Sequence, residues 1–348
     1  MVRKSWLLLL VICLATFGQA GNLEAVRFKC QKIAENFTPN GINNKAQVIG
    51  TVQVPGGYAH GAIWTPGQGA PQDLGTLGGN ETYPMDLNDA GQVVGYSYTL
   101  SGAQHAFIWD QTNQIQDLGG LGGDTQAAWG INNLGVAVGY STTPPGPPYY
   151  GASHSLLWTW LGLLDMGAEA PANCINDNIW VAGTVDANPC LWKYPGPQLL
   201  SLGGLLPGDT ICHIRKINNK GQVVGESFPN SGSPIHGCLW TSDGNPPQNL
   251  GNLGGLYTTP YDINDWGWIV GESQPAGLPT SHAFLRTPKD GMQDLNNLLL
   301  NNPLQGVEYL TMARGVNNRG QIICFSSFHI SYLLTPISAP PLQLLLLD

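Results

Sequence analysis

The chain has 348 residues, a net charge of −9 and only 11% charged residues, less than half of the roughly 25% typical of a soluble domain. The acidic balance offers no basic face to neutralise phosphates, which argues against binding to nucleic acid or to anionic lipid. With 46 Gly and 26 Pro beside 42% hydrophobic residues, the composition excludes disorder and favours short strands joined by turns.

The first predicted element is an export signal over residues 1–20. A basic start at Arg3 precedes an apolar stretch from Trp6 to Phe17, and small residues follow, so cleavage is expected near Ala20. The stretch is too short for a comfortable membrane span, so the mature chain is expected to have none, although an uncleaved anchor would use the same residues. The segment predicts a secreted, periplasmic or cell-surface protein.

After this segment, a phrase built around asparagine recurs with a steady period. It reads apolar residue, Asn, then Asn or Asp, any residue, and usually Gly; the first asparagines are Asn43, Asn88, Asn132, Asn176, Asn218, Asn264 and Asn317. Counting from each to the next gives 45, 44, 44, 42, 46 and 53 residues. A period of this length indicates one supersecondary unit repeated along the chain.

Each repeat contains four short apolar runs with the composition of strands. In the second copy they are Pro84–Leu87, Gln92–Ser97, His105–Trp109 and Ile115–Gly119. They are rich in β-branched or aromatic residues and are bounded by turn residues, so they predict strands and leave no room for a helix. The third run is apolar on both faces, which requires a sheet on either side. The repeat therefore predicts a four-stranded β-propeller blade.

The number of strands predicts how the ring closes. The first three strands occur seven times but the fourth only six times, and the missing strand is expected from Val26–Ile33, just before the first copy. Pairing of this segment with the last blade would close the ring. The predicted fold is all-β, a single β-propeller over residues 25–336 with seven blades, six or eight being the lesser options. A C-terminal tail over residues 337–348 follows.

Several phrases of the repeat also point to a known family. Ile-Asn-Asn, Gln-Val-Val-Gly-Tyr-Ser, His-Ala-Phe-Ile-Trp and Asp-Leu-Gly-x-Leu-Gly-Gly recur between residues 40 and 336. They resemble the bacterial HAF-family probable extracellular repeats, named for the His-Ala-Phe triplet. The resemblance implies export and supplies no catalytic mechanism. The fourth copy departs from it, with Asn188-Pro189-Cys190 in place of the triplet.

The repeated polar residues are assigned structural roles. Equivalent positions are spread around a ring, whereas metal ligands must converge, so no metal site is predicted at His60, His105, His154, His236, His282 and His329. The turn residues Asp73, Asp117, Asp165 and Asp294 are not expected to act as the paired carboxylates of a glycosidase. The phrases beginning at Asp86 and Asp262 lack the ligands of a calcium loop. No catalytic, metal-ligating or cofactor-binding residue is predicted.

Binding residues are expected where the repeat is broken. Trp266 and Trp268 stand in and beside a hairpin turn where most other copies carry polar residues, and an exposed tryptophan there could stack on a sugar or on a partner's side chain. Tyr149 and Tyr150 follow a proline-rich stretch and are further candidates, because a stiff aromatic loop suits recognition.

Two glutamates raise the question of catalysis. Glu226 and Glu272 replace tyrosines after the strand glycine, and solvated strand ends are favoured over an acid/base pair. The absence of a nucleophile elbow and of a metal signature favours binding over catalysis. The preferred prediction is an exported, monomeric, noncatalytic β-propeller that binds an unknown protein or glycan ligand. The alternatives are a glycan-directed hydrolase or lyase and a purely structural envelope component.

Overall fold

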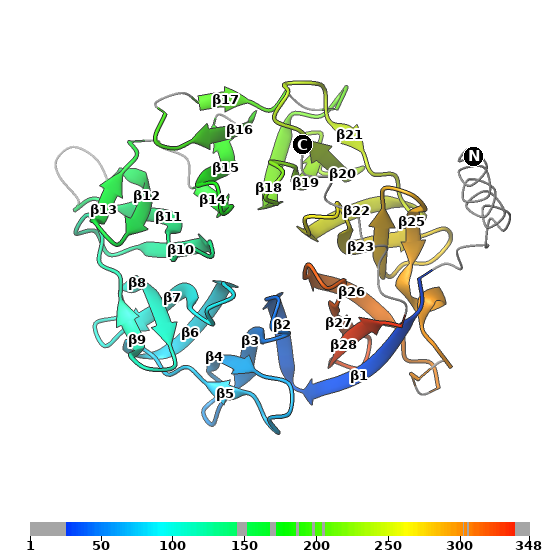
Figure 1. Cartoon of the computed structure of the whole chain (residues 1–348), viewed down its shortest axis with the longest axis horizontal. Coiled ribbons are helices and arrows are strands. Elements are labelled where there is room, and N and C mark those ends of the chain that lie inside the picture. The colour runs from blue at the N-terminus through cyan, green and yellow to red at the C-terminus, as the bar shows by residue number, and fades with distance from the viewer. Residues whose placement is uncertain are drawn as a thin grey trace, which may run out of the picture.

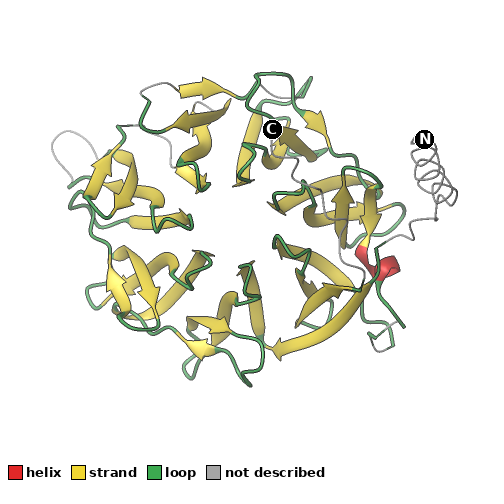
Figure 2. Ribbon diagram, viewed as in Figure 1, coloured by secondary structure: helices red, strands yellow, loops and turns green. Residues whose placement is uncertain are grey.

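The computed structural model describes residues 26–144, 152–167, 172–185, 188–196, 199–203, 206–301, 303–304 and 306–337. Within these ranges the chain forms seven four-stranded antiparallel sheets, arranged as blades around a central axis (Figure 1). One 3₁₀ turn, η1 (Leu295–Leu298), interrupts the strands and loops of this part of the chain (Figure 2). The predicted seven-bladed β-propeller is confirmed. The predicted export signal and the tail from residue 338 lie outside the described residues.

Within each blade the first strand lies beside the axis and the following strands lie progressively further out. Blade 1 contains β2 (Phe37–Ile42), β3 (Val48–Gln53), β4 (Ala59–Trp64) and β5 (Gln72–Asp73). Blade 2 contains β6 (Gly78–Leu87), β7 (Val93–Thr99), β8 (Gln104–Asp110) and β9 (Gln114–Asp117). Blade 3 contains β10 (Gln126–Ile131), β11 (Ala137–Thr142), β12 (Ser153–Thr159) and β13 (Gly162–Asp165).

The next three blades follow the same order. Blade 4 contains β14 (Ala172–Ile175), β15 (Trp180–Val185), β16 (Asn188–Lys193) and β17 (Leu199–Ser201). Blade 5 contains β18 (Ile211–Ile217), β19 (Val223–Phe228), β20 (His236–Trp240) and β21 (Gln248–Asn249). Blade 6 contains β22 (Gly254–Ile263), β23 (Ile269–Pro275), β24 (His282–Thr287) and β25 (Gly291–Asp294).

Blade 7 combines the two ends of the described chain. It contains β26 (Leu310–Val316), β27 (Ile322–Ser326), β28 (Ile330–Pro336) and, as its outer strand, β1 (Phe28–Glu35). β1 pairs antiparallel with β28, from Phe28 opposite Pro336 to Glu35 opposite Ile330. Phe28 is fully buried beside Leu295 of blade 6, and Ile33 packs with Phe37 of blade 1. The predicted closure of the ring by the N-terminal strand is confirmed.

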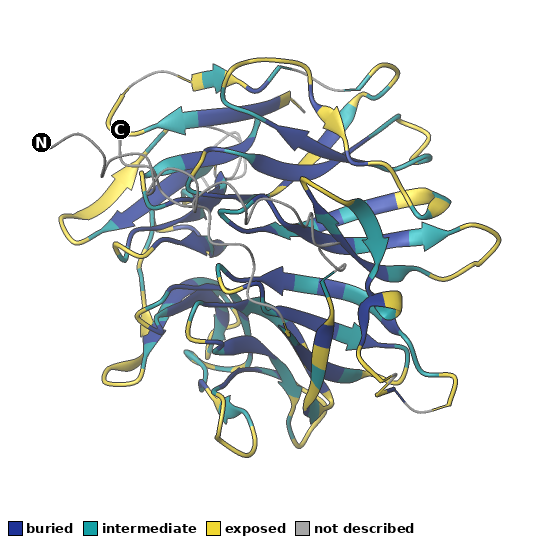
Figure 3. Cartoon of the chain, turned by 45° about the vertical axis from the view of Figure 1, so that its right-hand side comes forward, coloured by how far each residue is buried: buried dark blue, intermediate teal, exposed yellow. Residues whose placement is uncertain are grey.

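The hydrophobic core lies between the blades. Val94 and Ala106 of blade 2 pack with Ala137 and Leu156 of blade 3, and other clusters repeat this arrangement around the ring. Buried residues follow the middles of the strands, while exposed residues gather in the loops (Figure 3). Because each sheet is covered on both faces, few strand positions meet water, which accounts for the low charge content.

The glycine of the second strand is required by a close approach between neighbouring strands. A Cβ at Gly139 would lie 1.9 Å from the carbonyl oxygen of Ala127, and one at Gly95 would lie 2.1 Å from that of Tyr83. The φ of neither glycine is positive. Just beyond this contact the inner strand shifts register, between Ala128 and Gly130 in blade 3. Only glycine lets the two backbones approach this closely beside the bulge.

The histidines of the repeat stabilise the outer part of the blades. His105 Nδ1 lies 2.6 Å from Asp117 Oδ2, and the same carboxylate accepts a hydrogen bond from the Gly119 amide. Equivalent pairs join His60 to Asp73, His154 to Asp165 and His282 to Asp294. Each pair ties the third strand of a blade to its fourth strand. The structural role predicted for these residues agrees with the observed contacts.

The buried cysteines provide a first prediction. Burial raises the pKa of Cys174 to about 12 and that of Cys190 and Cys238 to about 11, which leaves little thiolate at neutral pH. We expect a thiol reagent to label these residues slowly in the folded protein and rapidly in denaturant, as measured by mass spectrometry of the alkylated peptides. Rapid labelling of Cys174 in the native state would contradict the described packing.

Candidate functional site

Seven asparagines form a closed ring of hydrogen bonds around the axis, here called the Asn ring. Within its own turn, Asn43 Oδ1 accepts hydrogen bonds from the amides of Lys45 and Gln47. Its Nδ2 donates to the carbonyl oxygen of Asn88 in the next blade. In the same way, Nδ2 of each further asparagine donates to the carbonyl oxygen of the asparagine in the next blade, over 2.9–3.1 Å, and the last of them donates to Asn43. These asparagines are Asn88, Asn132, Asn176, Asn218, Asn264 and Asn317. The repeated asparagine therefore closes its own turn and also joins adjacent blades.

The next residue of each phrase forms a second ring. Each of its backbone amides donates to the side-chain Oδ1 of the corresponding residue in the following blade. The ring members alternate between amide and carboxylate, in the order Asn44, Asp89, Asn133, Asp177, Asn219, Asp265 and Asn318. An amide can donate to a neighbouring carboxylate, as Asn44 Nδ2 does to Asp89 Oδ2 at 2.9 Å. Seven members cannot alternate completely, so two asparagines meet where blade 7 adjoins blade 1.

A central pocket of about 650 Å³ lies along the axis beside these rings. Each inner strand has a β-bulge just before its asparagine phrase. No two blades carry the same pair of residues at the bulge, and the first of each pair lines the pocket. The pairs are Asn40-Gly41, Met85-Asp86, Trp129-Gly130, Asn173-Cys174, Arg215-Lys216, Tyr261-Asp262 and Arg314-Gly315. The repeat is thus broken at the positions that face the axis.

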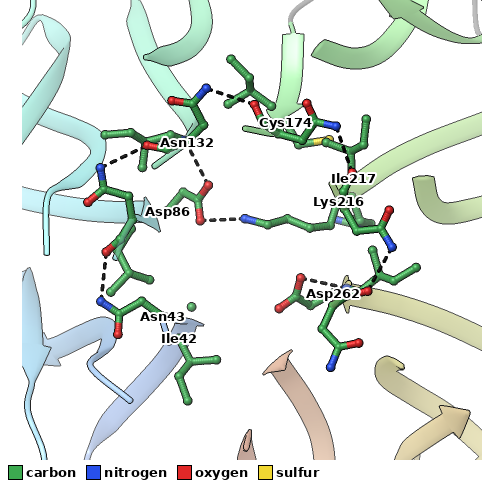
Figure 4. Close-up of a pocket in the computed structure, with 18 of the residues that line it drawn as sticks. Ile42, Asn43, Asp86, Asn132, Cys174, Lys216, Ile217 and Asp262 are labelled. Carbon is green, nitrogen blue, oxygen red and sulfur yellow. Dashed lines mark hydrogen bonds and ion pairs between the residues drawn. The ribbon is translucent and has the colours of Figure 1, made fainter. Parts of the chain in front are cut away.

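An ion pair crosses this pocket. Lys216 of blade 5 extends toward blade 2, where its Nζ lies 2.7 Å from Oδ1 of the buried Asp86 (Figure 4). Asp86 Oδ2 also accepts the amide of Ile131, and Asp262 Oδ2 accepts that of Val316, so both carboxylates join neighbouring blades. Burial lowers the pKa of Lys216, but the charges of Asp86 and Asp262 outweigh burial and hold the pKa above its ordinary value.

A polar wall occupies the side of the pocket formed by blades 5 to 7. Glu226 is 3% exposed and accepts two hydrogen bonds from the guanidinium of Arg215. His213 Nδ1 lies 3.2 Å from Glu226 Oε1. The prediction of a solvated strand end at Glu226 is wrong, because the Arg215 guanidinium on the adjacent strand pairs with the carboxylate and permits its burial. His213 itself stays exposed, and its Nε2 has no hydrogen-bond partner within the described ranges.

Tyr261 and Arg314 complete the polar wall. The Tyr261 hydroxyl donates a hydrogen bond to Glu272, and burial together with the Glu272 charge raises the pKa of Tyr261 above its ordinary value. The Arg314 guanidinium lies 4.4 Å from the centre of the Tyr261 ring, and that of Arg215 lies 5.7 Å from it. Arg314 Nε donates a weak hydrogen bond to the Met312 sulfur at 3.2 Å, but the guanidinium forms no ion pair with any residue that the structure describes, so its charge is available to a ligand.

On the opposite side of the pocket, Trp129 of blade 3 lines the cavity and belongs to an aromatic cluster of blades 2 and 3. Tyr83 stacks on Tyr96 at 5.0 Å, and Tyr96 meets the edge of Trp129 at 6.1 Å. Trp129 also stacks on Tyr140 at 6.1 Å, with an angle of 17° between the rings. These four residues are here called the aromatic wall. Burial raises the pKa of Tyr96 to about 12, so this hydroxyl stays uncharged at neutral pH.

The two sides of the pocket also differ in charge. Between Lys45 and Lys193 the sequence contains no Lys or Arg, so blades 2 and 3 supply no cationic side chain. The charge of Glu81 acts on this side and, together with burial, raises the pKa of Tyr83. Arg215 and Arg314 both belong to the opposite side. A ligand with one charged and one uncharged end would therefore bind in a defined direction.

Of the binding candidates chosen from the sequence, Trp266 and Trp268 do not line this pocket. Trp266 and Trp268 meet edge to face at 5.6 Å and pack against blade 7, where a Cβ on Gly320 would lie 3.0 Å from the Trp268 ring. Trp268 is 9% exposed, so the expected exposed ring is not found there. The role of this pair in binding stays a prediction. Tyr149 and Tyr150 lie outside the described residues.

Two further features of the described residues bear on function. They contain no helix that is long and apolar enough to cross a membrane. In the same ranges, no three side chains among His, Cys, Asp and Glu gather in a way that could hold a metal ion.

Comparisons with known proteins identify structural neighbours. No family model matches the chain, and no curated protein matches it. An oligogalacturonate lyase in complex with manganese is 12% identical with a TM-score of 0.57, over 91% of this chain and 97% of that one. An oligogalacturonate lyase from Vibrio parahaemolyticus is 10% identical with a TM-score of 0.52, over 89% and 91%. A virginiamycin B lyase from Staphylococcus aureus with quinupristin is 12% identical with a TM-score of 0.56, over 88% and 99%.

At these identities the likeness shows the fold alone. It nevertheless contradicts the preferred prediction of a noncatalytic binding module, because these three propellers, which match over most of both chains, are lyases. The preference for a binding module rested on the absence of known catalytic motifs from the sequence. A propeller site assembled from one or two residues of each blade leaves no contiguous motif, so that absence carried little weight. The neighbours favour the alternative, a glycan-directed hydrolase or lyase on a propeller scaffold, over the earlier preference.

Proposed function

We propose that this protein is a lyase that cleaves uronate-bearing glycans by β-elimination in the central pocket. The observation that carries the proposal is the His213–Glu226 pair, which lies on the same wall as the unpaired Arg314. The fold likeness to oligogalacturonate lyases supports the reaction class. The predicted export signal and the HAF resemblance support action outside the cytoplasm.

His213 is assigned as the general base. A carboxylate beside Nδ1 favours the tautomer in which that nitrogen carries the proton, which leaves the Nε2 lone pair free to accept one. The buried Glu226 supplies that carboxylate, and its bonds to Arg215 fix its position. A positioned base of this kind contributes about 10²–10⁴ in rate.

Arg314 is assigned to the substrate carboxylate. Removal of the proton next to a carboxylate places negative charge on that group, and a guanidinium stabilises this charge through paired hydrogen bonds. Arg215 lies on the same wall, but Glu226 already occupies its Nε and Nη2 atoms. Arg314 is therefore the principal anion-binding residue.

Tyr261 is assigned as the general acid. Its raised pKa keeps the hydroxyl protonated at neutral pH, and the guanidinium groups near its ring stabilise the phenolate that forms. In the reaction the C5–H bond breaks as Nε2 of His213 takes the proton, a double bond forms between C4 and C5, and the C4–O bond breaks. The leaving oxygen takes the Tyr261 proton, and solvent returns a proton from His213 to Tyr261.

The test uses the purified full chain with a panel of uronate glycans and neutral glycans, followed by two readouts. Elimination produces a conjugated double bond that absorbs in the ultraviolet together with new reducing ends, whereas hydrolysis produces reducing ends alone. We expect both signals from a uronate glycan and neither from a neutral one. Reducing ends without ultraviolet absorbance would assign a hydrolase instead, and no turnover on any uronate glycan would overturn the proposal.

A further inference from the structure

The aromatic wall indicates a second sugar subsite in the central pocket. Trp129 lines the pocket, and its ring contacts those of Tyr96 and Tyr140, which fix its position. Rings fixed in this way lose little conformational freedom when a ligand binds. The apolar face of a pyranose ring stacks on an aromatic ring such as that of Trp129.

The charges around the wall select the kind of sugar that stacks there. No Lys or Arg occurs between Lys45 and Lys193, so nothing on blades 2 and 3 neutralises a carboxylate. Asp86 of blade 2 is already paired with Lys216 of blade 5, so neither charge is free, and the charge of Glu81 acts on Tyr83. A uronate placed against Trp129 would find no unpaired cation among the described residues there, whereas Arg314 on the facing side has no ion-pair partner in the same ranges, so an uncharged sugar is favoured at Trp129.

The polar wall has the opposite preference. Arg314 has no carboxylate partner among the described residues, while Trp129 on the facing side offers an uncharged ring. A pocket of about 650 Å³ falls within the range that holds an oligosaccharide of a few sugars. Both walls therefore contact one short glycan segment.

Building on the proposed function, we propose that the substrate alternates, with the uronate held by Arg314 and an adjacent uncharged sugar stacked on Trp129. A homopolymer of uronates would place a carboxylate against the aromatic wall. The chain is thus specific for mixed uronate glycans, unlike a lyase that acts on a run of identical uronates.

Calorimetry with two tetrasaccharides of equal length tests this inference, one alternating uronate with neutral sugar and one built of uronates alone. We expect the full chain to bind the alternating tetrasaccharide at least tenfold more tightly. Trp129→Ala should weaken that binding about tenfold and change binding of the homouronate little. Trp160→Ala is the matched control, because Trp160 lies in the outer β12–β13 hairpin of the same blade and is 69% exposed.

The calorimetric result can be separated from the proposed reaction. If no glycan is cleaved but Trp129→Ala abolishes the preference for the alternating tetrasaccharide, the lyase proposal fails and the subsite stands. If elimination occurs but the homouronate binds equally well or better, the lyase proposal stands and the subsite is overturned. Equal affinity of Trp129→Ala and the unaltered chain for the alternating tetrasaccharide would also overturn the subsite.

Discussion

Replacing His213 with alanine is expected to lower kcat at least a hundredfold on a uronate glycan, with a much smaller change in KM. The imidazole takes the substrate proton in the transition state, whereas Arg314 and the aromatic wall supply most of the binding in the ground state. The effect is measured as the initial rate at which ultraviolet absorbance increases, over a range of substrate concentrations.

His60→Ala is the matched control for this variant. His60 also pairs with a carboxylate, Asp73, but it lies at the outer rim of blade 1 and away from the pocket. We expect its kcat to stay within about twofold of the unaltered chain, while a slight loss of stability follows from the broken pair. Retention of most activity by His213→Ala would remove this residue from the mechanism.

The second large effect is on stability. Lys216→Met should lower the free energy of unfolding by about 3 kcal/mol, because it leaves the 5% exposed Asp86 without a cation. We use the lower end of the range for a broken buried pair, since the Lys216 side chain is 30% exposed. Urea unfolding, followed by tryptophan fluorescence, measures the change.

A second substitution separates lost charge pairing from lost packing. In the Lys216→Met background, Asp86→Asn removes the unpaired charge and keeps a side-chain oxygen that accepts the Ile131 amide. We therefore expect it to restore a large part of the lost stability, although the same substitution in the unaltered chain is expected to destabilise it. An additive loss in the double variant would show that the cross-pocket ion pair contributes little.

The blade architecture could be predicted from the sequence because its signals are local and repeated. The runs after Asn88, such as His105–Trp109, show the strand period within a few residues, and seven copies reinforce one another. The closing strand could also be predicted, because only six fourth strands were found for seven blades. The segment Val26–Ile33, just before the first copy, had the composition of the missing strand. The contact between Phe28 and Leu295 then follows from the ring.

The inter-blade contacts could not be predicted in the same way. The sequence indicated that the asparagine bonds to the backbone of its own turn. Its hydrogen bond to the next blade, as from Asn43 to Asn88, depends on how two turns meet in space. Burial of Trp268 depends likewise on Gly320 of the following blade. Such contacts leave no trace in the residues that immediately flank either partner.

The residues of the central pocket could not be predicted from the sequence for a related reason. No two copies carry the same two residues before the asparagine phrase, which was visible in the sequence. Only the structure shows that the first residue of each pair lines the pocket and that Asp86 and Lys216, each the second of its pair, meet across it. The absence of Lys and Arg between Lys45 and Lys193 was also visible in the sequence. This absence indicates a charge difference across the pocket only because blades 2 and 3 lie opposite Arg215 and Arg314.

The central claim is that chemistry takes place at the axis of the ring, between the polar wall and the aromatic wall. A crystal structure of His213→Ala with an alternating tetrasaccharide tests it most directly, because this variant retains the substrate. We predict a uronate carboxylate within hydrogen-bond distance of Arg314 and a neutral ring stacked on Trp129. A tetrasaccharide bound at the outer rim, or beside Trp266, would contradict the claim.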